Sequence, residues 1–173
     1  MNFPLNLVRS SFLLALLWGV VSVAGAADLP IPAPPTVAAK GSLLIDHHTG
    51  RILAEHNADE RLEPASLTKI LSAYVVFREL AEGKISLQDE VLVSKKAWQT
   101  PGSRMFIEVG KKVPLEDLLI GMIVQSGNDA SVALAEHVAG SESTFAELMN
   151  THAQRLGMEN SHFVNATGLP DPD

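Results

Sequence analysis

Two short motifs carry side chains that could do acyl-transfer chemistry. They are Ser66-x-x-Lys69 and Ser126-Gly127-Asn128. Residues three apart on a helix share one face, with Cβ atoms about 5–6 Å apart, so a helical Ser66 and Lys69 would meet. A serine hydroxyl is a weak nucleophile that needs a neighbouring base, and a lysine can be that base where burial or a nearby cation lowers its pKa. The first motif therefore predicts a Ser/Lys nucleophile pair.

The second motif offers a hydroxyl and an amide on one turn. In an extended turn, residues two apart point the same way, and Gly127 allows another chain or a ligand to approach closely. The Ser126 hydroxyl could relay a proton, and the Asn128 amide could hold Lys69 or a substrate carbonyl. Each motif alone also fits a helix cap, because Ser and Asn are preferred there. The catalytic hypothesis therefore depends on the two motifs occurring together.

Apolar periodicity indicates the elements that must position these motifs. From Ser66 onward the apolar residues repeat at helical spacing, and Gly83 ends that helix. Ser126 and Asn128 then fall between two further apolar helices. The free N–H groups of a helix start could also bind an oxyanion beside Ser66. The other expected elements are a hairpin of strands 41–46 and 51–56, short strands at 90–93 and 106–109, and helices after Pro114, over 129–138 and from about 142 to 156.

The composition limits the class of protein. The chain has 173 residues, of which 46% are hydrophobic and 19% charged, which is typical of one globular domain with a real core. Because it has no cysteine, a thiol nucleophile and a Cys-ligated metal are excluded. The net charge of −7, without a Lys/Arg cluster, argues against nucleic-acid binding. His47-His48 is interpreted as a turn, because no third ligand stands nearby, and no metal site is predicted.

The N-terminus has the pattern of a secretory signal peptide. Arg9 precedes an uncharged run over 12–27 that ends in the small-x-small residues 24–26. Residues 1–26 are therefore predicted to be removed on export, and an uncleaved membrane anchor is the alternative. The Pro- and Ala-rich residues 27–40 are interpreted as a linker. The catalytic region is then expected over 41–173.

The two motifs and their surroundings resemble one enzyme family. Ser-x-x-Lys followed by Ser-x-Asn belongs to the motif set of class A β-lactamases and penicillin-binding proteins. Residues 64–69, 102–106, 121–130 and 163–170 resemble the D-alanyl-D-alanine carboxypeptidases, which are low-molecular-mass penicillin-binding proteins. The resemblance implies an α+β, penicillin-recognising fold, in which helices flank a sheet and the nucleophile begins a central helix.

The resemblance also implies a reaction and roles for the four residues. The enzyme would remove the terminal D-Ala from peptidoglycan stem peptides in the periplasm, in cell wall biogenesis. Ser66 would form the acyl-enzyme and Lys69 would take its proton. Ser126 would help return that proton to the leaving amine, and Asn128 would hold the acyl chain or Lys69. No cofactor is expected, and β-lactams would acylate Ser66 because they mimic the substrate.

One element of the family pattern does not occur in these residues. The family has a Lys-Thr-Gly on a strand downstream, whereas Thr167-Gly168 here follows Ala166. The chain is therefore expected to hold the first hairpin and the helical region, without the C-terminal strands of the sheet. The family's C-terminal membrane-associating region, which would attach the enzyme to the inner membrane, is also expected to lie outside these residues.

Several other functions compete with this interpretation. A D,D-endopeptidase acting on cross-links would use the same motifs, and a truncated chain without Lys-Thr-Gly would be an inactive remnant or a binding module. A class A β-lactamase is disfavoured because no Glu follows Glu159 to serve deacylation. A metallopeptidase is disfavoured because His137, His152 and His162 lack the spacing of a His-Glu-x-x-His site.

Overall fold

The computed structural model describes residues 33–171, which divide into two compact units at Glu60 and Arg61. The predicted signal peptide and the first residues of the predicted linker lie outside the described residues. Residues 33–40 are exposed and contain no helix or strand.

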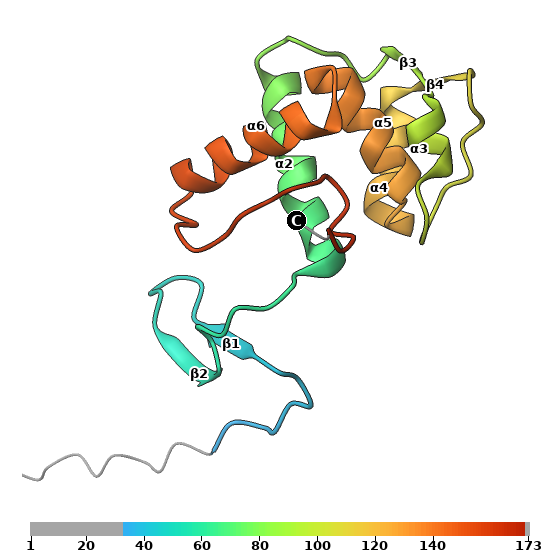
Figure 1. Cartoon of the computed structure of the whole chain (residues 1–173). Coiled ribbons are helices and arrows are strands. Elements are labelled where there is room, and N and C mark those ends of the chain that lie inside the picture. The colour runs from blue at the N-terminus through green and yellow to red at the C-terminus, as the bar shows by residue number, and fades with distance from the viewer. Residues whose placement is uncertain (1–32, 172–173) are drawn as a thin grey trace, which may run out of the picture. The chain divides into compact units, whose positions relative to one another are not determined.

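The first unit is the predicted β-hairpin. Strands β1 (Ser42–Ile45) and β2 (Ile52–His56) pair antiparallel (Figure 1). The Asp46 carboxylate organises the turn, because its Oδ1 accepts the Thr49 N–H at 2.8 Å and the Thr49 hydroxyl at 2.5 Å. These bonds from Thr49 lower the pKa of Asp46.

The hairpin carries apolar side chains on both faces. Leu43 and Leu44, which are 51% and 55% exposed, are consecutive in β1 and so point to opposite faces. Strands that are apolar on both faces are typical of sheets covered on both sides. A two-stranded hairpin of this kind has little stability without a packing partner.

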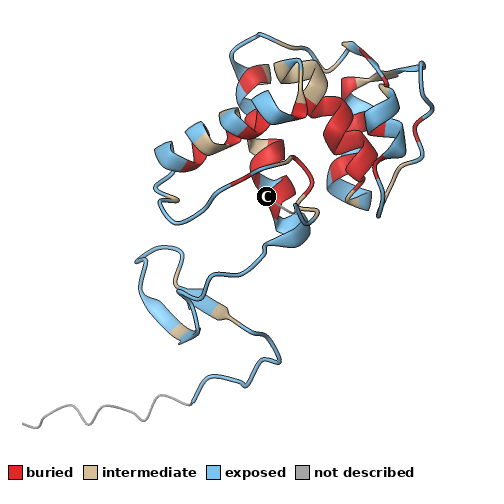
Figure 2. Cartoon of the chain, viewed as in Figure 1, coloured by how far each residue is buried: buried red, intermediate tan, exposed pale blue. Residues whose placement is uncertain are grey.

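The second unit is a group of helices packed around α5 (Asn128–Ala139), whose residues 128–135 are all buried. Helices α2, α3, α4 and α6 all contact α5 (Figure 1). The buried side chains follow this arrangement, with α5 at the centre of the core (Figure 2). The other elements are η1 (Ala65–Leu67), α2 (Thr68–Ala81), β3 (Glu90–Leu92), α3 (Lys95–Gln99), β4 (Lys112–Pro114), α4 (Leu115–Gln125) and α6 (Glu142–Arg155).

The strand expected at 90–93 is confirmed, but the strand expected at 106–109 is wrong. Residues 101–109 form an irregular loop, in which the Ile107 N–H binds the Asp129 carboxylate at 3.2 Å instead of a neighbouring strand. The partner of β3 is β4, with Val91 opposite Val113. The apolar pattern of 106–109 therefore reflects one buried side chain, that of Ile107, rather than a strand.

The helices after Pro114 and over 129–138 and 142–156 are confirmed within a residue or two. The structure adds α3, a helix too short for apolar periodicity to reveal. Its N-cap is Ser94, whose Oγ accepts the Ala97 N–H at 2.9 Å. Within residues 33–171, no helix is both long and apolar enough to cross a membrane.

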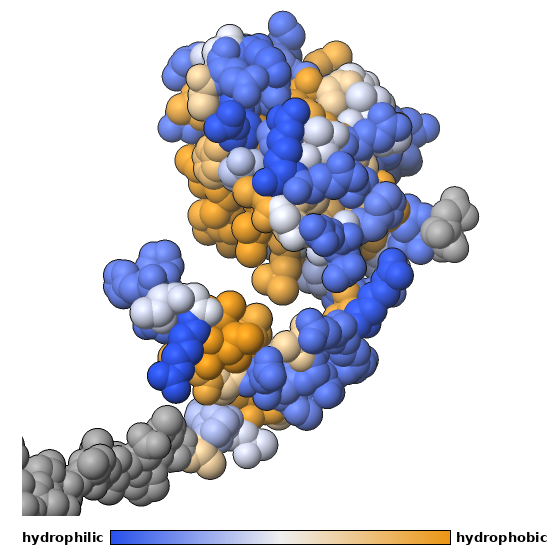
Figure 3. Space-filling model, turned by 90° about the vertical axis from the view of Figure 1, so that its left-hand side faces the viewer, coloured by the Kyte–Doolittle hydropathy of each residue, from blue (hydrophilic) through white to orange (hydrophobic). Residues whose placement is uncertain are grey.

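The apolar stripe of α2 is only partly covered. Leu71, Val75 and Val76 are buried, whereas Leu67 and Ile70 are 67% and 69% exposed. Figure 3 shows apolar surface on both units. Residues at helical spacing from Leu67 onward therefore do not all face the core of this unit.

Candidate active site

Ser66 and Lys69 are brought together at the start of α2, as their spacing predicts. Ser66 lies in the single turn η1, and Lys69 lies in the first turn of α2. The Lys69 Nζ is 3.1 Å from the Ser66 Oγ. Ser66 is exposed, whereas Lys69 is only 6% exposed. The hydroxyl is thus open to a substrate while its neighbouring amine is held inside the protein.

The environment of Lys69 favours an amine that can act as a base. Burial lowers the pKa of Lys69 below its ordinary value of 10.5, because removing an ammonium group from water disfavours the charged form. No ion pair of Lys69 with a carboxylate occurs among the described residues. A neutral Lys69 beside Ser66 could therefore accept the hydroxyl proton.

The Lys69 amine makes a second hydrogen bond, to a backbone carbonyl near the C-terminus. Lys69 Nζ donates to the Thr167 carbonyl at 2.9 Å, and Ser72 Oγ donates to the Ala166 carbonyl at 2.9 Å. Gly168 packs directly on the turn before α2, since a Cβ built on it would lie 1.8 Å from the Ala65 carbonyl oxygen. Residues 163–169 therefore lie along the first turns of α2.

The Asn165 side chain shapes this segment. Its Oδ1 accepts the Thr167 N–H at 3.1 Å, the Thr167 hydroxyl at 3.0 Å and the Gly168 N–H at 2.8 Å. Its Nδ2 donates to the Leu169 carbonyl at 2.9 Å. An Asn side chain that binds its own backbone in this way forms an Asx turn, which fixes the direction of the following carbonyls.

Helix α6 anchors the same segment. The Asn150 amide binds both backbone groups of Phe163, donating to its carbonyl at 2.7 Å and accepting its N–H at 2.8 Å. The Glu142 Oε1 accepts the Ala166 N–H at 3.1 Å, and its Oε2 pairs with Lys96 at 2.7 Å. Side chains of α6 thus hold the segment that contacts Lys69 at two points, Phe163 and Ala166.

Ser126 and Asn128 lie at the junction of α4 and α5, where the sequence places them. Ser126 ends α4 in the left-handed region, with φ 57°, which is uncommon for a residue other than glycine. Among the residues that the structure describes, its Oγ is the buried side-chain oxygen without a hydrogen-bond partner. A buried hydroxyl with unused bonding capacity on strained backbone is typical of a functional position.

Asn128 binds the neighbouring loop rather than Lys69. Its Nδ2 donates to the Pro101 carbonyl at 2.7 Å, and its N–H donates to the Ser103 carbonyl at 2.7 Å. Neither of these bonds reaches Lys69, and the expected role of Asn128 in holding the acyl chain or Lys69 stays a prediction. Because a Cβ on Gly102 would lie 3.9 Å from the Leu169 Cδ2, the loop and the 163–169 segment approach each other beside Asn128.

Asp129 is a supporting residue for which the sequence indicates no role. It is 1% exposed, and its carboxylate accepts the Met105 N–H at 3.0 Å and the Ile107 N–H at 3.2 Å. These bonds flank Phe106, which is 75% exposed with φ 63° and has the Arg104 guanidinium 5.1 Å from its ring centroid. The loop beside Ser126-Gly127-Asn128 is thus fixed from inside the protein.

The structure therefore joins Ser66 to Lys69 and places Ser126 and Asn128 at the junction of α4 and α5, two helices that pack against α2. The sequence alone missed the Thr167 carbonyl, Asn165 and Asp129. Asn-x-Thr-Gly at 165–168 is a turn composition that could have indicated the Asx turn. The hydrogen bond between Lys69 and the Thr167 carbonyl joins residues 98 apart, and no sequence pattern predicts it.

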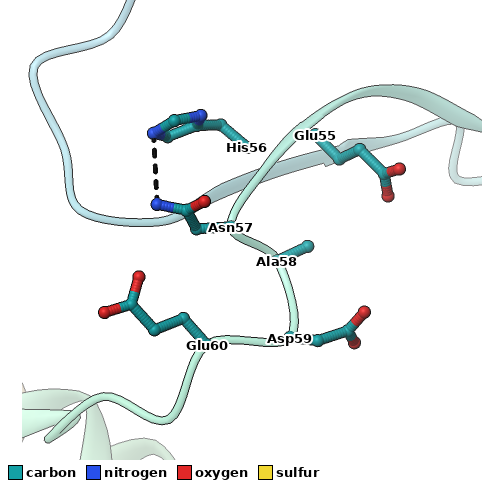
Figure 4. A pocket seen from close by; sticks show the side chains of 6 residues that line it. All are labelled: Glu55, His56, Asn57, Ala58, Asp59 and Glu60. Atoms are coloured by element: carbon teal, nitrogen blue, oxygen red, sulfur yellow. Dashed lines mark hydrogen bonds between the residues drawn. The ribbon is translucent and has the colours of Figure 1, made fainter.

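A shallow hollow on the loop after β2 has a different character (Figure 4). It is lined by the six consecutive residues Glu55–Glu60, and the Glu60 carboxylate points to the opposite side from those of Glu55 and Asp59. In its polar contacts, Asn57 Nδ2 lies 3.3 Å from His56 Nε2 and donates to the Lys40 carbonyl at 2.9 Å. This hollow is the shape of an exposed turn and brings no catalytic set together.

Comparison with known proteins places the chain among enzymes of one kind. The model of the D-alanyl-D-alanine carboxypeptidase family matches residues 29–173. The D-alanyl-D-alanine carboxypeptidase DacC of Escherichia coli K12 is 46% identical over an alignment of 164 residues that covers 91% of this chain and 41% of that protein. A D-alanyl-D-alanine endopeptidase of Pseudomonas aeruginosa is 32% identical over an alignment of 141 residues that covers 80% of this chain and 44% of that protein.

Solved structures that are similar to this one include penicillin-binding proteins. The crystal structure of penicillin-binding protein 5 from Haemophilus influenzae superposes with a TM-score of 0.78 at 42% identity, over 82% of this chain and 42% of that one. The expected α+β, penicillin-recognising fold is thereby confirmed. The chain spans about two fifths of the length of the curated relatives that it matches.

Proposed function

The chain belongs to the D-alanyl-D-alanine carboxypeptidase family, and from this premise we propose that it supplies the nucleophile and base of a serine-type D-Ala-D-Ala carboxypeptidase. The observation that carries the proposal is the buried Lys69 amine, 3.1 Å from the exposed Ser66 hydroxyl. The substrates are peptidoglycan stem peptides that end in D-Ala-D-Ala. Because the chain spans about two fifths of its relatives, the activity is proposed for the whole protein that contains it.

In the proposed acylation, Lys69 takes the proton of the Ser66 hydroxyl as its oxygen attacks the carbonyl of the penultimate D-Ala. The bond from that carbonyl to the terminal D-Ala nitrogen then breaks, and the nitrogen leaves with the proton that Lys69 had taken. Water hydrolyses the resulting ester and releases the shortened peptide. The bond to the Thr167 carbonyl, at 2.9 Å, stabilises the ammonium that forms on Lys69 during the first step.

Ser126 and Asn128 have supporting roles in this proposal. The unpartnered Ser126 Oγ is free to relay the proton from Lys69 to the leaving nitrogen. Asn128, at the start of α5, is proposed to hold the acyl chain or Lys69 when substrate is bound. The N–H groups at the start of α2, including that of Ser66, are proposed to bind the oxyanion, since helix starts carry partial positive charge.

The alternative functions predict different products. A D,D-endopeptidase would release peptide from a cross-linked dimer, whereas the proposed carboxypeptidase releases D-Ala from a monomeric pentapeptide. The test is to measure free D-Ala released from the pentapeptide and monomer released from the dimer, with the intact protein and with its Ser66→Ala variant. Release from the dimer alone would make the endopeptidase correct, and no Ser66-dependent product from either peptide would make the chain an inactive remnant or a binding module.

We also propose that the protein is exported to the periplasm and attached to the inner membrane. The support is the signal-peptide pattern of residues 1–26, together with a substrate that lies outside the cytoplasm. N-terminal sequencing of the exported protein, recovered from the membrane and periplasmic fractions, is expected to begin at Ala27. A start at Met1 in a membrane fraction would instead indicate the uncleaved anchor.

The apolar hairpin supports a larger sheet in the whole protein. Side chains of both faces of β1 are about half exposed, as with Leu43 at 51% and Leu44 at 55%. Further strands and helices would remove this apolar surface from water. We propose that these strands include the Lys-Thr-Gly of the family pattern, whose charge would bind the substrate carboxylate.

A further inference from the structure

We propose that Asn165 is a positioning residue that aims the Lys69 amine at Ser66 through the backbone of Thr167. The proposal deepens the proposed function and rests on it, because it assigns a role within the same Ser66/Lys69 pair. Asn165 contacts neither of those two side chains. It acts by setting the direction of one carbonyl, that of Thr167, which accepts a hydrogen bond from Lys69 Nζ at 2.9 Å.

Most of this turn depends on one side chain, that of Asn165. A single oxygen, Asn165 Oδ1, accepts three hydrogen bonds, two from Thr167 and one from Gly168. The Thr167 hydroxyl in turn accepts the Leu169 N–H at 3.1 Å. Without Asn165 Oδ1, the Thr167 and Gly168 N–H groups would lose the partner that bends the chain at this point. The turn would then no longer fix where the Thr167 carbonyl points.

The Thr167 carbonyl faces a buried amine, that of Lys69. Thr167 is 3% exposed and Lys69 is 6% exposed, so little water is available to replace the bond between them. The neighbouring Ala166 carbonyl is used as well, by Ser72 Oγ at 2.9 Å. The two carbonyls therefore bind two side chains one helical turn apart on α2, which fixes the segment against the catalytic helix.

A lysine that acts as a base needs its lone pair directed at the proton that it takes. A neutral amine has two N–H groups and one lone pair. When one N–H is bound to the Thr167 carbonyl, rotation about the Cε–Nζ bond is restricted and the lone pair can stay directed at Ser66 Oγ, 3.1 Å away. The same bond becomes charge-assisted once the amine is protonated, so it favours the transition state over the ground state. Its loss should slow acylation more than it weakens binding.

The test compares three variants of the intact protein. Asn165→Ala removes both the acceptor and the donor, whereas Asn165→Asp keeps an acceptor oxygen at the same place. Asn160→Ala is the matched control, because Asn160 is an exposed Asn on the loop that leads into this segment. If Asn165→Ala does not fold, Asn165→Ser takes its place, since a hydroxyl there can still accept one bond. The rate of acylation by benzylpenicillin is measured across pH and over a series of benzylpenicillin concentrations. This series gives the maximal acylation rate constant and, separately, the benzylpenicillin concentration at half-saturation.

We expect Asn165→Ala to slow acylation by about 10- to 100-fold, as displaced catalytic groups typically do, with the half-saturating concentration unchanged. Asn165→Ala displaces the carbonyl that stabilises the Lys69 ammonium and admits water beside it, so the pKa of Lys69 should shift and the pH profile should move with it. Asn165→Asp should keep most of the plateau rate, and Asn160→Ala should match the parent. Equal rates and pH profiles in Asn165→Ala and Asn160→Ala would overturn the proposal, as would an Asn165→Asp plateau no higher than that of Asn165→Ala.

A second readout separates this proposal from the proposed function. The Lys69 side chain is titrated by NMR in protein with ¹³C-labelled lysine, a measurement that needs no reaction. A pKa of Lys69 that shifts in Asn165→Ala but not in Asn160→Ala supports the positioning role even if benzylpenicillin does not react, in which case the proposed function fails alone. An unchanged Lys69 titration in Asn165→Ala contradicts the positioning role even if Ser66 is acylated normally.

Discussion

Replacing Gly168 with alanine should disable the site through backbone contact alone. A Cβ at this position would lie 1.8 Å from the Ala65 carbonyl oxygen and 2.5 Å from the Ala65 carbonyl carbon, whereas ordinary contact begins at 3.4 Å. The two backbones must therefore separate by roughly 1.6 Å, the difference between those oxygen distances. Neither partner is the end of a flexible side chain, so the movement has to fall on the 163–169 segment or on the turn that carries Ser66.

A displacement of this size is larger than the Lys69–Thr167 hydrogen bond can tolerate at its present 2.9 Å. Misplacing a catalytic group by about 1 Å typically costs on the order of 100-fold in rate. We therefore expect Gly168→Ala to slow β-lactam acylation of Ser66 by about that factor or more. The fold should also lose stability, because an alanine in the left-handed region costs about 1–2 kcal/mol.

Gly157→Ala is the matched control for this experiment. Gly157 has φ 77° and Gly168 has φ 76°, but a Cβ on Gly157 would meet nothing within 4 Å. Both variants therefore carry the same backbone strain, and each kcal/mol of it should lower the Tm by about 2–4 °C. Only Gly168→Ala should also lose acylation. Similar acylation rates in the two variants, measured at a temperature where both are folded, would refute the reasoning about contact with Ala65.

Two further predictions concern titratable groups. Lys69→Arg should reduce acylation by about 10²–10⁴-fold, because a guanidinium stays protonated and cannot act as a base; in the parent, the rate measured by stopped flow should rise with pH through the lowered pKa of Lys69. Burial, with a smaller contribution from Arg155, lowers the pKa of His152 below 6.5. The unfolded chain binds a proton at His152 more readily than the folded protein does. The stability that the neutral His152 contributes should therefore be complete above about pH 6.5 and be lost as the pH falls through the pKa of His152 in the folded protein. His152→Gln should flatten the acid side of a plot of Tm against pH, and an unchanged slope would be inconsistent with a buried neutral imidazole.

The sequence predicted what depends on local patterns. The hairpin around residues 47–50 and the long helices follow from alternation, helical periodicity and terminal glycines, and the Ser66/Lys69 contact follows from their spacing on one helical turn. The strand expected at 106–109 was wrong because a buried carboxylate, that of Asp129, binds the backbone there. Short apolar runs do not reveal which partner their N–H groups have.

The parts of the site that the sequence could not predict are tertiary. The Thr167 carbonyl reaches Lys69 only because Asn165 closes a turn and α6 anchors that turn through Asn150. None of these residue types is unusual, and their roles depend on distances across the fold. Leu67 lies on the apolar stripe of α2 but is exposed, so helical spacing alone did not predict its burial. The matched relative DacC is more than twice as long as this chain.

The central claim is that Ser66 is the nucleophile and that the buried Lys69 activates it. The most direct measurement is mass spectrometry of the intact protein after incubation with benzylpenicillin, followed by peptide mapping. The account predicts one penicilloyl group, on Ser66, that is absent in Ser66→Ala and forms far more slowly in Lys69→Arg. A stable adduct on another residue, or equal labelling of the parent and Ser66→Ala, would contradict it.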